Sequence, residues 1–287
     1  MHFVRVKGIL SSKNGMNIYR GCSHGCIYCD SRSKCYQMKH EFKDIEIKEN
    51  ALELLENTLK HKRKKCIIGT GAMSDPYMPI EKVLGYTRKA MNLAYQYGFG
   101  FTLITKSDLV LRDLDLLKKI NDQSKAVVQV TLTTYDDQLS KQLEPNVCTT
   151  QQRIEILRRC AQLNIPTIVW LCPILPFIND TKENIEAILN ACIEYKVKGI
   201  ICFGMGVTLR EGNREYFYEQ LKKLYPNLLN KYIKIYGNRY ILSSPHHQEL
   251  MKYFHTTCEA NGILHDVDTI FRYLNTYETK NEQLSLF

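Results

Sequence analysis

Three cysteines near the N-terminus are the residues of this chain whose types and spacing are best suited to chemistry. Cys22, Cys26 and Cys29 follow the pattern C-x3-C-x2-C, and Tyr28 stands directly before the third cysteine. A [4Fe–4S] cluster that only stores electrons normally takes four protein thiolates, so three thiolates leave one iron open to a small molecule. An open iron indicates catalysis.

A structural zinc site is the alternative for these cysteines, with Cys35 as the fourth ligand of a zinc knuckle. A third possibility is that the thiols only pack in the core. Structural zinc sites usually use pairs of C-x2-C type, and only Cys26 and Cys29 fit that spacing. The pattern therefore favours the iron–sulfur cluster.

Short apolar runs alternate with amphipathic helical stretches along the first two thirds of the chain, which predicts βα units and a parallel sheet. The periodicity of leucine, isoleucine and alanine indicates the helices. Strands are expected at residues 16–19, 66–69, 100–105, 126–133, 167–172 and 199–203, and helices at residues 48–62, 81–97, 109–121, 151–163 and 181–195. Six strands predict an α/β fold with a partial barrel.

The rhythm of strands and helices is lost from about residue 212, where the chain becomes rich in tyrosine and ends in a helix near residues 245–261. We therefore expect three parts. Residues 1–211 form the partial barrel with its N-terminal cluster loop, residues 212–274 an α-rich extension packed on the barrel, and residues 275–287 a polar, flexible tail.

Polar residues or a thiol follow four of the expected strands at their carboxyl ends. Ser74 and Asp75 follow the second strand, Lys106 the third, Thr133 the fourth and Cys172 the fifth. Barrel enzymes place their catalytic groups on this face, and the cysteine loop follows the first strand. We expect these side chains to lie near the cluster.

The cysteine motif, with its aromatic residue before the third cysteine, resembles that of the radical S-adenosylmethionine (radical SAM) enzymes. The resemblance implies a six-stranded (β/α) partial barrel, a [4Fe–4S] cluster held by Cys22, Cys26 and Cys29, and Tyr28 beside the adenine of S-adenosylmethionine. It also implies reductive cleavage of S-adenosylmethionine to a 5′-deoxyadenosyl radical that abstracts hydrogen, with electrons from a donor such as flavodoxin or ferredoxin.

Further segments resemble the spore photoproduct lyase-like branch of these enzymes. In that branch the residues matching Ser74 and Lys106 contact S-adenosylmethionine, and Asp75 and Thr133 are candidates for the same role. Asp75 would alternatively cap its own loop, because aspartate before proline is common in turns. The segments that carry this resemblance are residues 69–81, 105–107 and 173–180, together with residues 144–146 and Arg153.

One departure from that branch concerns the hydrogen donor. True spore photoproduct lyases carry a cysteine on the second loop, where this chain has Ala72. Cys172 is a candidate replacement, and the alternative is that it is a buried structural thiol. The departure argues against spore photoproduct lyase activity itself.

Composition adds expectations about partners and compartment. The 287 residues include 39 lysines and arginines against 30 acidic residues, and the net charge of +9 favours a polyanionic partner. Eleven cysteines suit a reducing compartment, and the sequence has no apolar run as long as a membrane span or a signal peptide. We expect a cytoplasmic protein that does not enter membranes.

Two features favour DNA as the partner. The last five residues, Gln283, Leu284, Ser285, Leu286 and Phe287, resemble the pentapeptide by which bacterial polymerases and repair proteins bind the sliding clamp. The alternative is a tail that folds back over the barrel. Bases could stack on tyrosines while cations meet phosphates. Tyrosines at this density also pack in cores, and we expect many of these to do so. The residues concerned are Tyr216, Tyr218, Tyr225, Tyr232, Tyr236 and Tyr240, with Lys222, Lys223, Lys231, Lys234 and Arg239.

The sequence thus predicts a cytoplasmic radical SAM enzyme of lyase-like type that abstracts hydrogen from a nucleic acid, with DNA repair as the expected setting. One alternative keeps the chemistry and changes the substrate to a peptide, a protein or a small metabolite. Another is a non-catalytic, zinc-bearing or cluster-bearing protein that associates with DNA.

Overall fold

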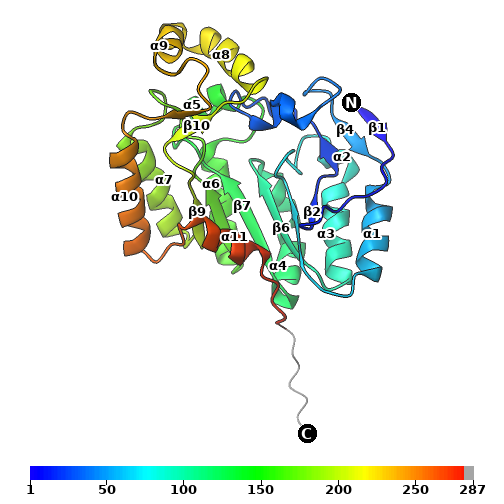
Figure 1. Ribbon diagram of the computed structural model, residues 1–287. Coiled ribbons are helices and arrows are strands. Elements are labelled where there is room, and N and C mark those ends of the chain that lie inside the picture. The colour runs from blue at the N-terminus through cyan, green and yellow to red at the C-terminus, as the bar shows by residue number, and fades with distance from the viewer. Residues whose placement is uncertain (281–287) are drawn as a thin grey trace.

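A sheet of parallel strands forms the centre of the computed structural model, which describes residues 1–280. The strand order is β2-β5-β6-β7-β8-β9, so each strand lies beside the next one along the barrel (Figure 1). The strands are β2 (Gly15–Met16), β5 (Ile67–Thr70), β6 (Gly100–Thr105), β7 (Ala126–Thr131), β8 (Thr167–Trp170) and β9 (Gly199–Ile201). The predicted α/β partial barrel of six strands is confirmed.

Helices cover the outer face of this sheet, because a parallel sheet needs its faces buried. All residues of β7 are buried, and so are Phe101 and Leu103 of β6. Gly85, at a φ of 64°, divides the helix expected at residues 81–97 into two. The helices are α1 (Ala51–His61), α2 (Glu81–Leu84), α3 (Tyr86–Gln96), α4 (Leu114–Gln123), α5 (Asp137–Leu143), α6 (Thr150–Gln162) and α7 (Lys182–Glu194).

A small second sheet, with strands before and after the cysteine loop in the chain, supports that loop. It has the order β1-β4-β3, with β1 (His2–Val4) parallel to β4 (Glu46–Lys48) and β3 (Tyr19–Arg20) antiparallel to it. Strands of two or three residues are too short to show an alternating pattern, so the sequence did not predict them. Strand β3 leads directly into the cysteine loop, which ends in the 3₁₀ turns η1 (Asp30–Arg32) and η2 (Lys34–Tyr36).

The C-terminal third contains a pair of antiparallel strands and four helices. Strands β10 (Gly206–Thr208) and β11 (Ile241–Ser243) pair antiparallel, and α8 (Asn213–Leu224) and α9 (Pro226–Tyr236) lie between them in the chain. Figure 1 shows α8 and α9 above the sheet, whereas α10 (His247–Ala260) packs on α7 and α11 (Val267–Asn275) on β9. Helix α10 is the helix that the sequence predicts near residues 245–261.

Part of α10 shares the barrel core, because Leu250 and Phe254 belong to the same buried cluster as the barrel residues. Beyond α11 the chain still contacts the barrel. The Tyr277 hydroxyl donates a hydrogen bond of 2.8 Å to the carbonyl of Gly98. The division at residues 211 and 274 stays a prediction, and the clamp-binding pentapeptide at residues 283–287 lies outside the described residues.

No helix in the described chain has both the length and the apolar composition needed to cross a membrane.

Two glycines with positive φ give a test of the fold. A Cβ on Gly71, after β5, would lie 2.2 Å from the carbonyl oxygen of Ile104, whereas a Cβ on Gly85 meets nothing within 4 Å. We expect Gly71→Ala to lower the free energy of unfolding by more than about 3 kcal/mol, since overlap adds to backbone strain. Gly85→Ala should lower the free energy of unfolding by only about 1–2 kcal/mol, which is the cost of placing alanine in the left-handed conformation. Equal losses in urea unfolding would contradict this packing.

Candidate functional site

The three cysteines of the motif line one cavity of about 110 Å³ at the carboxyl edge of the sheet. Ala72, Ser74 and Asp75 reach this cavity from the loop after β5, and Thr105 and Lys106 from the end of β6. Thr131, at the end of β7, also lines it and was not predicted. The structure therefore brings the cysteines together with three of the predicted cofactor residues, Ser74, Asp75 and Lys106.

The thiols of this cavity are held largely out of water. Cys22 and Cys26 are buried and Cys29 is half-buried. Burial raises the pKa of Cys22 to about 12 and also raises that of Cys26, which the Lys106 cation opposes. Thiolates in such a place need a positive partner, and a bound metal displaces the thiol protons to become that partner.

The thiols are not arranged as the compact ligand group of a single zinc ion. Four thiolates on one tetrahedral zinc at a Zn–S distance of about 2.3 Å lie about 3.8 Å apart. Among residues 1–280, the cysteines belong to no group of ligand atoms that all lie within 4.8 Å of one another. Cys35, the fourth ligand of the alternative zinc knuckle, is exposed and does not line the cavity.

Lys106 places a positive charge at the inner wall of the cavity. Burial lowers the pKa of its ammonium group, but Cys26 and Glu144 outweigh burial and raise that pKa above its ordinary value. The ammonium nitrogen lies 5.8 Å from the centre of the Tyr28 ring. A charged lysine here is suited to hold the carboxylate of a small-molecule cofactor.

Ser74 and Asp75 fasten the loop after β5 to its neighbours. The Ser74 hydroxyl donates to the carbonyl of Gly21 at 2.5 Å. Asp75 accepts hydrogen bonds from the backbone N–H of Tyr77, the hydroxyl of Thr105 and the backbone N–H of Lys106, all at 2.8 Å. This geometry is that of the loop-capping alternative for Asp75, and its cofactor role stays a prediction.

A buried polar chain fixes Tyr28. Its hydroxyl donates to one carboxylate oxygen of Glu144, and the Arg153 guanidinium donates to the other. The side chains of Glu144 and Arg153 are fully buried. Burial alone would raise the pKa of Glu144, but Arg153 and Lys106 lower it below its ordinary value, so the carboxylate is charged.

Arg153 also bonds two backbone carbonyls near the sheet edge. Its guanidinium donates to the carbonyls of Thr131 and Cys148, each at 3.0 Å. Tyr28 itself does not line the cysteine cavity, and its contact with adenine stays a prediction.

The segment around Glu144 also holds the backbone of the cysteine loop. The N–H of Ile27 donates to the carbonyl of Leu143 at 3.0 Å. Asn146 donates to the carbonyls of His24 and Ser23, at 3.1 and 2.9 Å. In the sequence, residues 144–146 and Arg153 stand out only through the family resemblance. The one local sign of their positioning role is that an acidic residue, Glu144, and a basic residue, Arg153, lie close together in an otherwise amphipathic region.

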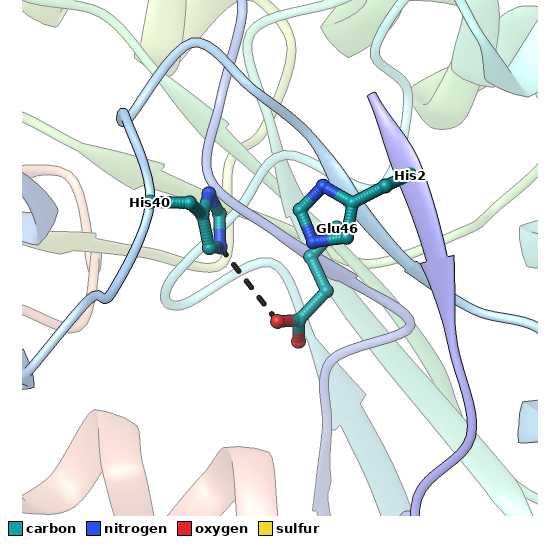
Figure 2. Close-up of side chains that lie close together, drawn as sticks. All are labelled: His2, His40 and Glu46. Atoms are coloured by element: carbon teal, nitrogen blue, oxygen red, sulfur yellow. Dashed lines mark ion pairs between the residues drawn. The ribbon is translucent and has the colours of Figure 1, made fainter.

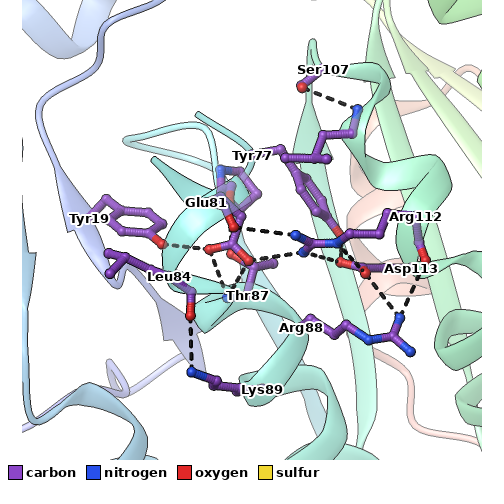
Figure 3. Close-up of polar contacts among 12 residues, drawn as sticks. Tyr19, Tyr77, Glu81, Leu84, Thr87, Arg88, Lys89, Ser107, Arg112 and Asp113 are labelled. Atoms are coloured by element: carbon purple, nitrogen blue, oxygen red, sulfur yellow. Dashed lines mark hydrogen bonds and ion pairs between the residues drawn. The ribbon is translucent and has the colours of Figure 1, made fainter. Parts of the chain in front are cut away.

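A second buried network supports the loop after β5 from below (Figure 3). Tyr19, next to the cysteine loop, donates to Glu81 at 2.5 Å, and Tyr77 donates to Asp113 at 3.0 Å. Arg112 bridges the two carboxylates, at 3.1 Å to Glu81 and 2.8 Å to Asp113. Both carboxylates are fully buried, so this ion network fixes the floor of the site.

Thr133 lies apart from the cysteine cavity. Its side chain is buried, and within the described chain its hydroxyl has no hydrogen-bond partner. Its carbonyl accepts from the amides of Asn179 and Asn184, at 2.6 and 3.0 Å. A role for Thr133 in cofactor binding stays a prediction.

A larger cavity of about 580 Å³ lies between the ends of β8 and β9 and the β10–β11 strand pair. Cys172 lines this cavity and not that of the three motif cysteines. Burial raises the pKa of its thiol to about 12. Arg210, Tyr240 and His247 line the same cavity, which is large enough for a small-molecule ligand.

The second cavity is tied to the cysteine loop. Arg210 forms an ion pair with Asp30, the residue that directly follows Cys29, and it also donates to the Tyr240 hydroxyl at 3.0 Å. If Arg210 moved, its ion pair with Asp30 would therefore transmit the movement directly to the cysteine loop.

The family model of the radical SAM superfamily matches residues 16–189, more than half of the chain. The fold agrees: a solved structure of a spore photoproduct lyase mutant superposes with a TM-score of 0.66 at 14% identity, covering 92% of this chain and 80% of that chain. This protein belongs to the radical SAM superfamily, whose enzymes use a [4Fe–4S] cluster and S-adenosylmethionine. The family supports the catalytic prediction over the non-catalytic alternatives.

Sequence relatives come from several kinds of organism. An uncharacterized protein of Methanocaldococcus jannaschii is 33% identical over 61% of this chain and 65% of its own length. An uncharacterized protein of Acidianus two-tailed virus is 27% identical over 78% of this chain and 81% of its own. A radical SAM Nalpha-GlyT isomerase of a Pseudomonas phage is 25% identical over 55% of this chain and 32% of its own.

The buried pair predicts a large effect of one arginine on stability. We expect Arg153→Ala to lower the free energy of unfolding by about 3–5 kcal/mol, because it leaves the Glu144 charge buried without its partner. The measurement is urea unfolding of the cluster-free protein followed by circular dichroism.

Arg158→Ala on the same helix is the matched control, because Arg158 and its partner Glu155 both lie at the surface. Surface ion pairs contribute little, so this variant should unfold like the unchanged protein. A loss for Arg153→Ala no larger than that for Arg158→Ala would show that the buried pair does not hold the loop.

Proposed function

We propose that this protein is a radical SAM enzyme whose substrate is a nucleic acid, and that Cys22, Cys26 and Cys29 hold its cluster. The observation that carries the first part is the convergence of the three thiols in one cavity beside Lys106. The bound cluster and cofactor together supply a 5′-deoxyadenosyl radical for hydrogen abstraction, which no side chain can generate unaided.

The residues around the thiols would bind and orient the cofactor. Lys106 supports this role with a half-buried positive charge, and the backbone around Ser74 with its place in the wall of the cavity. Asp75 orients Lys106 through the backbone bond described above. Burial of the thiols limits access of water to the reacting centre.

The second cavity is the proposed place of the substrate. Arg210 offers charge for a phosphate, and Phe203 and Tyr240, which are 63% and 45% exposed, offer aromatic faces for bases. Cys172 is the thiol that lines this cavity, so it remains the candidate hydrogen donor in place of the loop cysteine that Ala72 replaces.

Most of the tyrosine-rich segment serves the core instead of the surface. Tyr232 and Tyr236 are buried in one apolar cluster, and Tyr218 and Tyr225 pack against it. Among those tyrosines, Tyr240 is the exposed one that lines the second cavity. The proposed contact with bases therefore moves from α8 and α9 to the mouth of this cavity.

Two solved neighbours bear on the substrate class, and one of them supports a nucleic acid. One solved neighbour is a spore photoproduct lyase complexed with dinucleoside spore photoproduct, with a TM-score of 0.61 and coverage of 86% of this chain. Another is a radical SAM methyltransferase, TsrM of Kitasatospora setae, with tryptophan substrate and a TM-score of 0.52 over 73% of this chain. The first covers more of the chain, 86% against 73%, and supports the nucleic acid.

The cellular setting belongs to the same proposal. Eleven free cysteines support a reducing compartment such as the cytoplasm, where flavodoxin or ferredoxin could supply electrons. Binding of Gln283, Leu284, Ser285, Leu286 and Phe287 to a sliding clamp would bring the enzyme to DNA for repair. Removal of these residues would then abolish clamp binding and leave the chemistry of the barrel unchanged.

The ligand assignment predicts opposite outcomes for two cysteine substitutions. After anaerobic reconstitution, Cys26→Ala should bind less than half of the normal iron and form no 5′-deoxyadenosine, because one corner of the cluster loses its ligand. Cys35→Ser should keep both, since Cys35 is exposed and outside the cavity. Iron analysis and chromatography check this, and loss of iron in Cys35→Ser would favour the zinc-knuckle arrangement.

The substrate class is tested with the reconstituted enzyme, dithionite and S-adenosylmethionine. We expect ultraviolet-irradiated DNA to raise the rate of 5′-deoxyadenosine formation at least severalfold over unirradiated DNA, because a substrate that fits the second cavity promotes turnover. Arg210→Ala should weaken this stimulation, and Lys231→Ala, on the surface of α9, should not. Stimulation by a peptide mixture or metabolite pool but by neither DNA would overturn the nucleic-acid proposal.

A further inference from the structure

Two histidines and a glutamate meet on the small sheet, outside the cysteine cavity. His2 on β1 lies directly beside Glu46 on β4 in the parallel register, and His40 comes from the loop before β4. Figure 2 shows both imidazole rings and the carboxylate gathered around one point. One ligand atom from each residue lies within 4.8 Å of the others, close enough for a single metal ion.

Both imidazole rings are oriented through Nδ1. Nδ1 of His40 lies 3.0 Å from the backbone carbonyl of Glu41, which can only accept, so this nitrogen carries the hydrogen. Nδ1 of His2 lies 2.9 Å from a carboxylate oxygen of Asp44. Hydrogen bonds of this kind fix the tautomer of metal-binding histidines and leave the Nε2 lone pair free for the ion.

The free Nε2 of His40 is buried and has no hydrogen-bond partner within residues 1–280. It lies 3.7 Å from the Glu46 carboxylate, too far for a hydrogen bond. Nitrogen and oxygen ligands at about 2.0–2.2 Å from one zinc ion lie roughly 3–3.6 Å apart. The separation suits two ligands of a shared cation.

Within residues 1–280, no lysine or arginine forms an ion pair with Glu46. Arg20 lies opposite Glu46 in the sheet, but its guanidinium donates to the carbonyls of Tyr36 and Gln37, at 2.8 and 3.2 Å. Lys48 donates to the carbonyl of Asn17. In the described chain, His40 is the one basic side chain within salt-bridge distance of Glu46.

We propose that His2, His40 and Glu46 bind a divalent transition-metal ion of the zinc type, with water as a further ligand. Two imidazole nitrogens and one carboxylate oxygen form a donor set that zinc uses in proteins. None of the three residues lines the cluster cavity, so this site is separate from the iron–sulfur cluster.

Such an ion would stabilise the base of the cysteine loop. It would join β1, the loop that carries His40, and β4 at one point. The same loop accepts a hydrogen bond of 2.9 Å from the N–H of Cys22 at the carbonyl of Phe42. Fixing this loop would therefore hold Cys22 in place, and the ion would act structurally instead of as a second catalytic centre.

The test uses untagged, reconstituted holoenzyme, in which the cluster occupies the cysteines. After a chelator wash and dialysis against Zn²⁺, metal analysis should find one zinc beside four irons per chain. His40→Ala and Glu46→Gln should lose the zinc and keep the iron.

His265→Ala is the matched control, because His265 also lies near a histidine and a glutamate, His255 and Glu259, without forming such a ligand group in the described chain. It should keep the zinc. Zinc retained by both His40→Ala and Glu46→Gln, or absent from the unchanged enzyme, would overturn the proposal.

X-ray absorption at the zinc edge gives a second readout that does not depend on the folding of any variant. We expect nitrogen and oxygen neighbours only. Sulfur neighbours would place the zinc on the cysteines and overturn the site.

Discussion

The buried ion pair between Glu144 and Arg153 is the interaction on which the candidate site most depends. A buried ion pair adds little net stability when complete, yet removal of one partner is costly because the other charge stays without compensation. Here the carboxylate also accepts a hydrogen bond from the Tyr28 hydroxyl, and the guanidinium donates hydrogen bonds to carbonyls at the sheet edge. The pair thus holds Tyr28, which lies between Cys26 and Cys29, and so fixes this part of the cysteine loop against the barrel.

The rest of the loop is held from two further directions. Strand β3 and the carbonyl of Phe42 fix its start, next to Cys22, and the loop after β5 reaches it through the bond from Ser74 to Gly21. A flexible loop would lose much conformational entropy on binding a cluster, and a loop fixed at three places has already lost most of it. These contacts would therefore lower the entropic cost of binding a cluster.

The sequence predicted the barrel because short apolar runs alternate regularly with clear amphipathic helices. It predicted the gathering of Ser74, Asp75 and Lys106 because parallel strands end at one edge. It did not predict β1, β3 and β4, whose few residues carry no periodicity. It predicted that many of the tyrosines pack in the core but not that Tyr232 and Tyr236 are among them, since aromatic residues suit both cores and surfaces. Contacts such as Tyr28 with Glu144 join residues far apart in the chain, and local patterns do not encode them.

The central claim is that three thiolates hold a cluster with one open iron, and electron paramagnetic resonance tests it most directly. The reconstituted, reduced protein should show the spectrum of one [4Fe–4S] cluster, and addition of S-adenosylmethionine should change that spectrum because the cofactor binds the open iron. The change should be absent in a Cys29→Ser variant with incomplete cluster. A cluster spectrum that S-adenosylmethionine leaves unaltered in the unchanged protein would contradict the account.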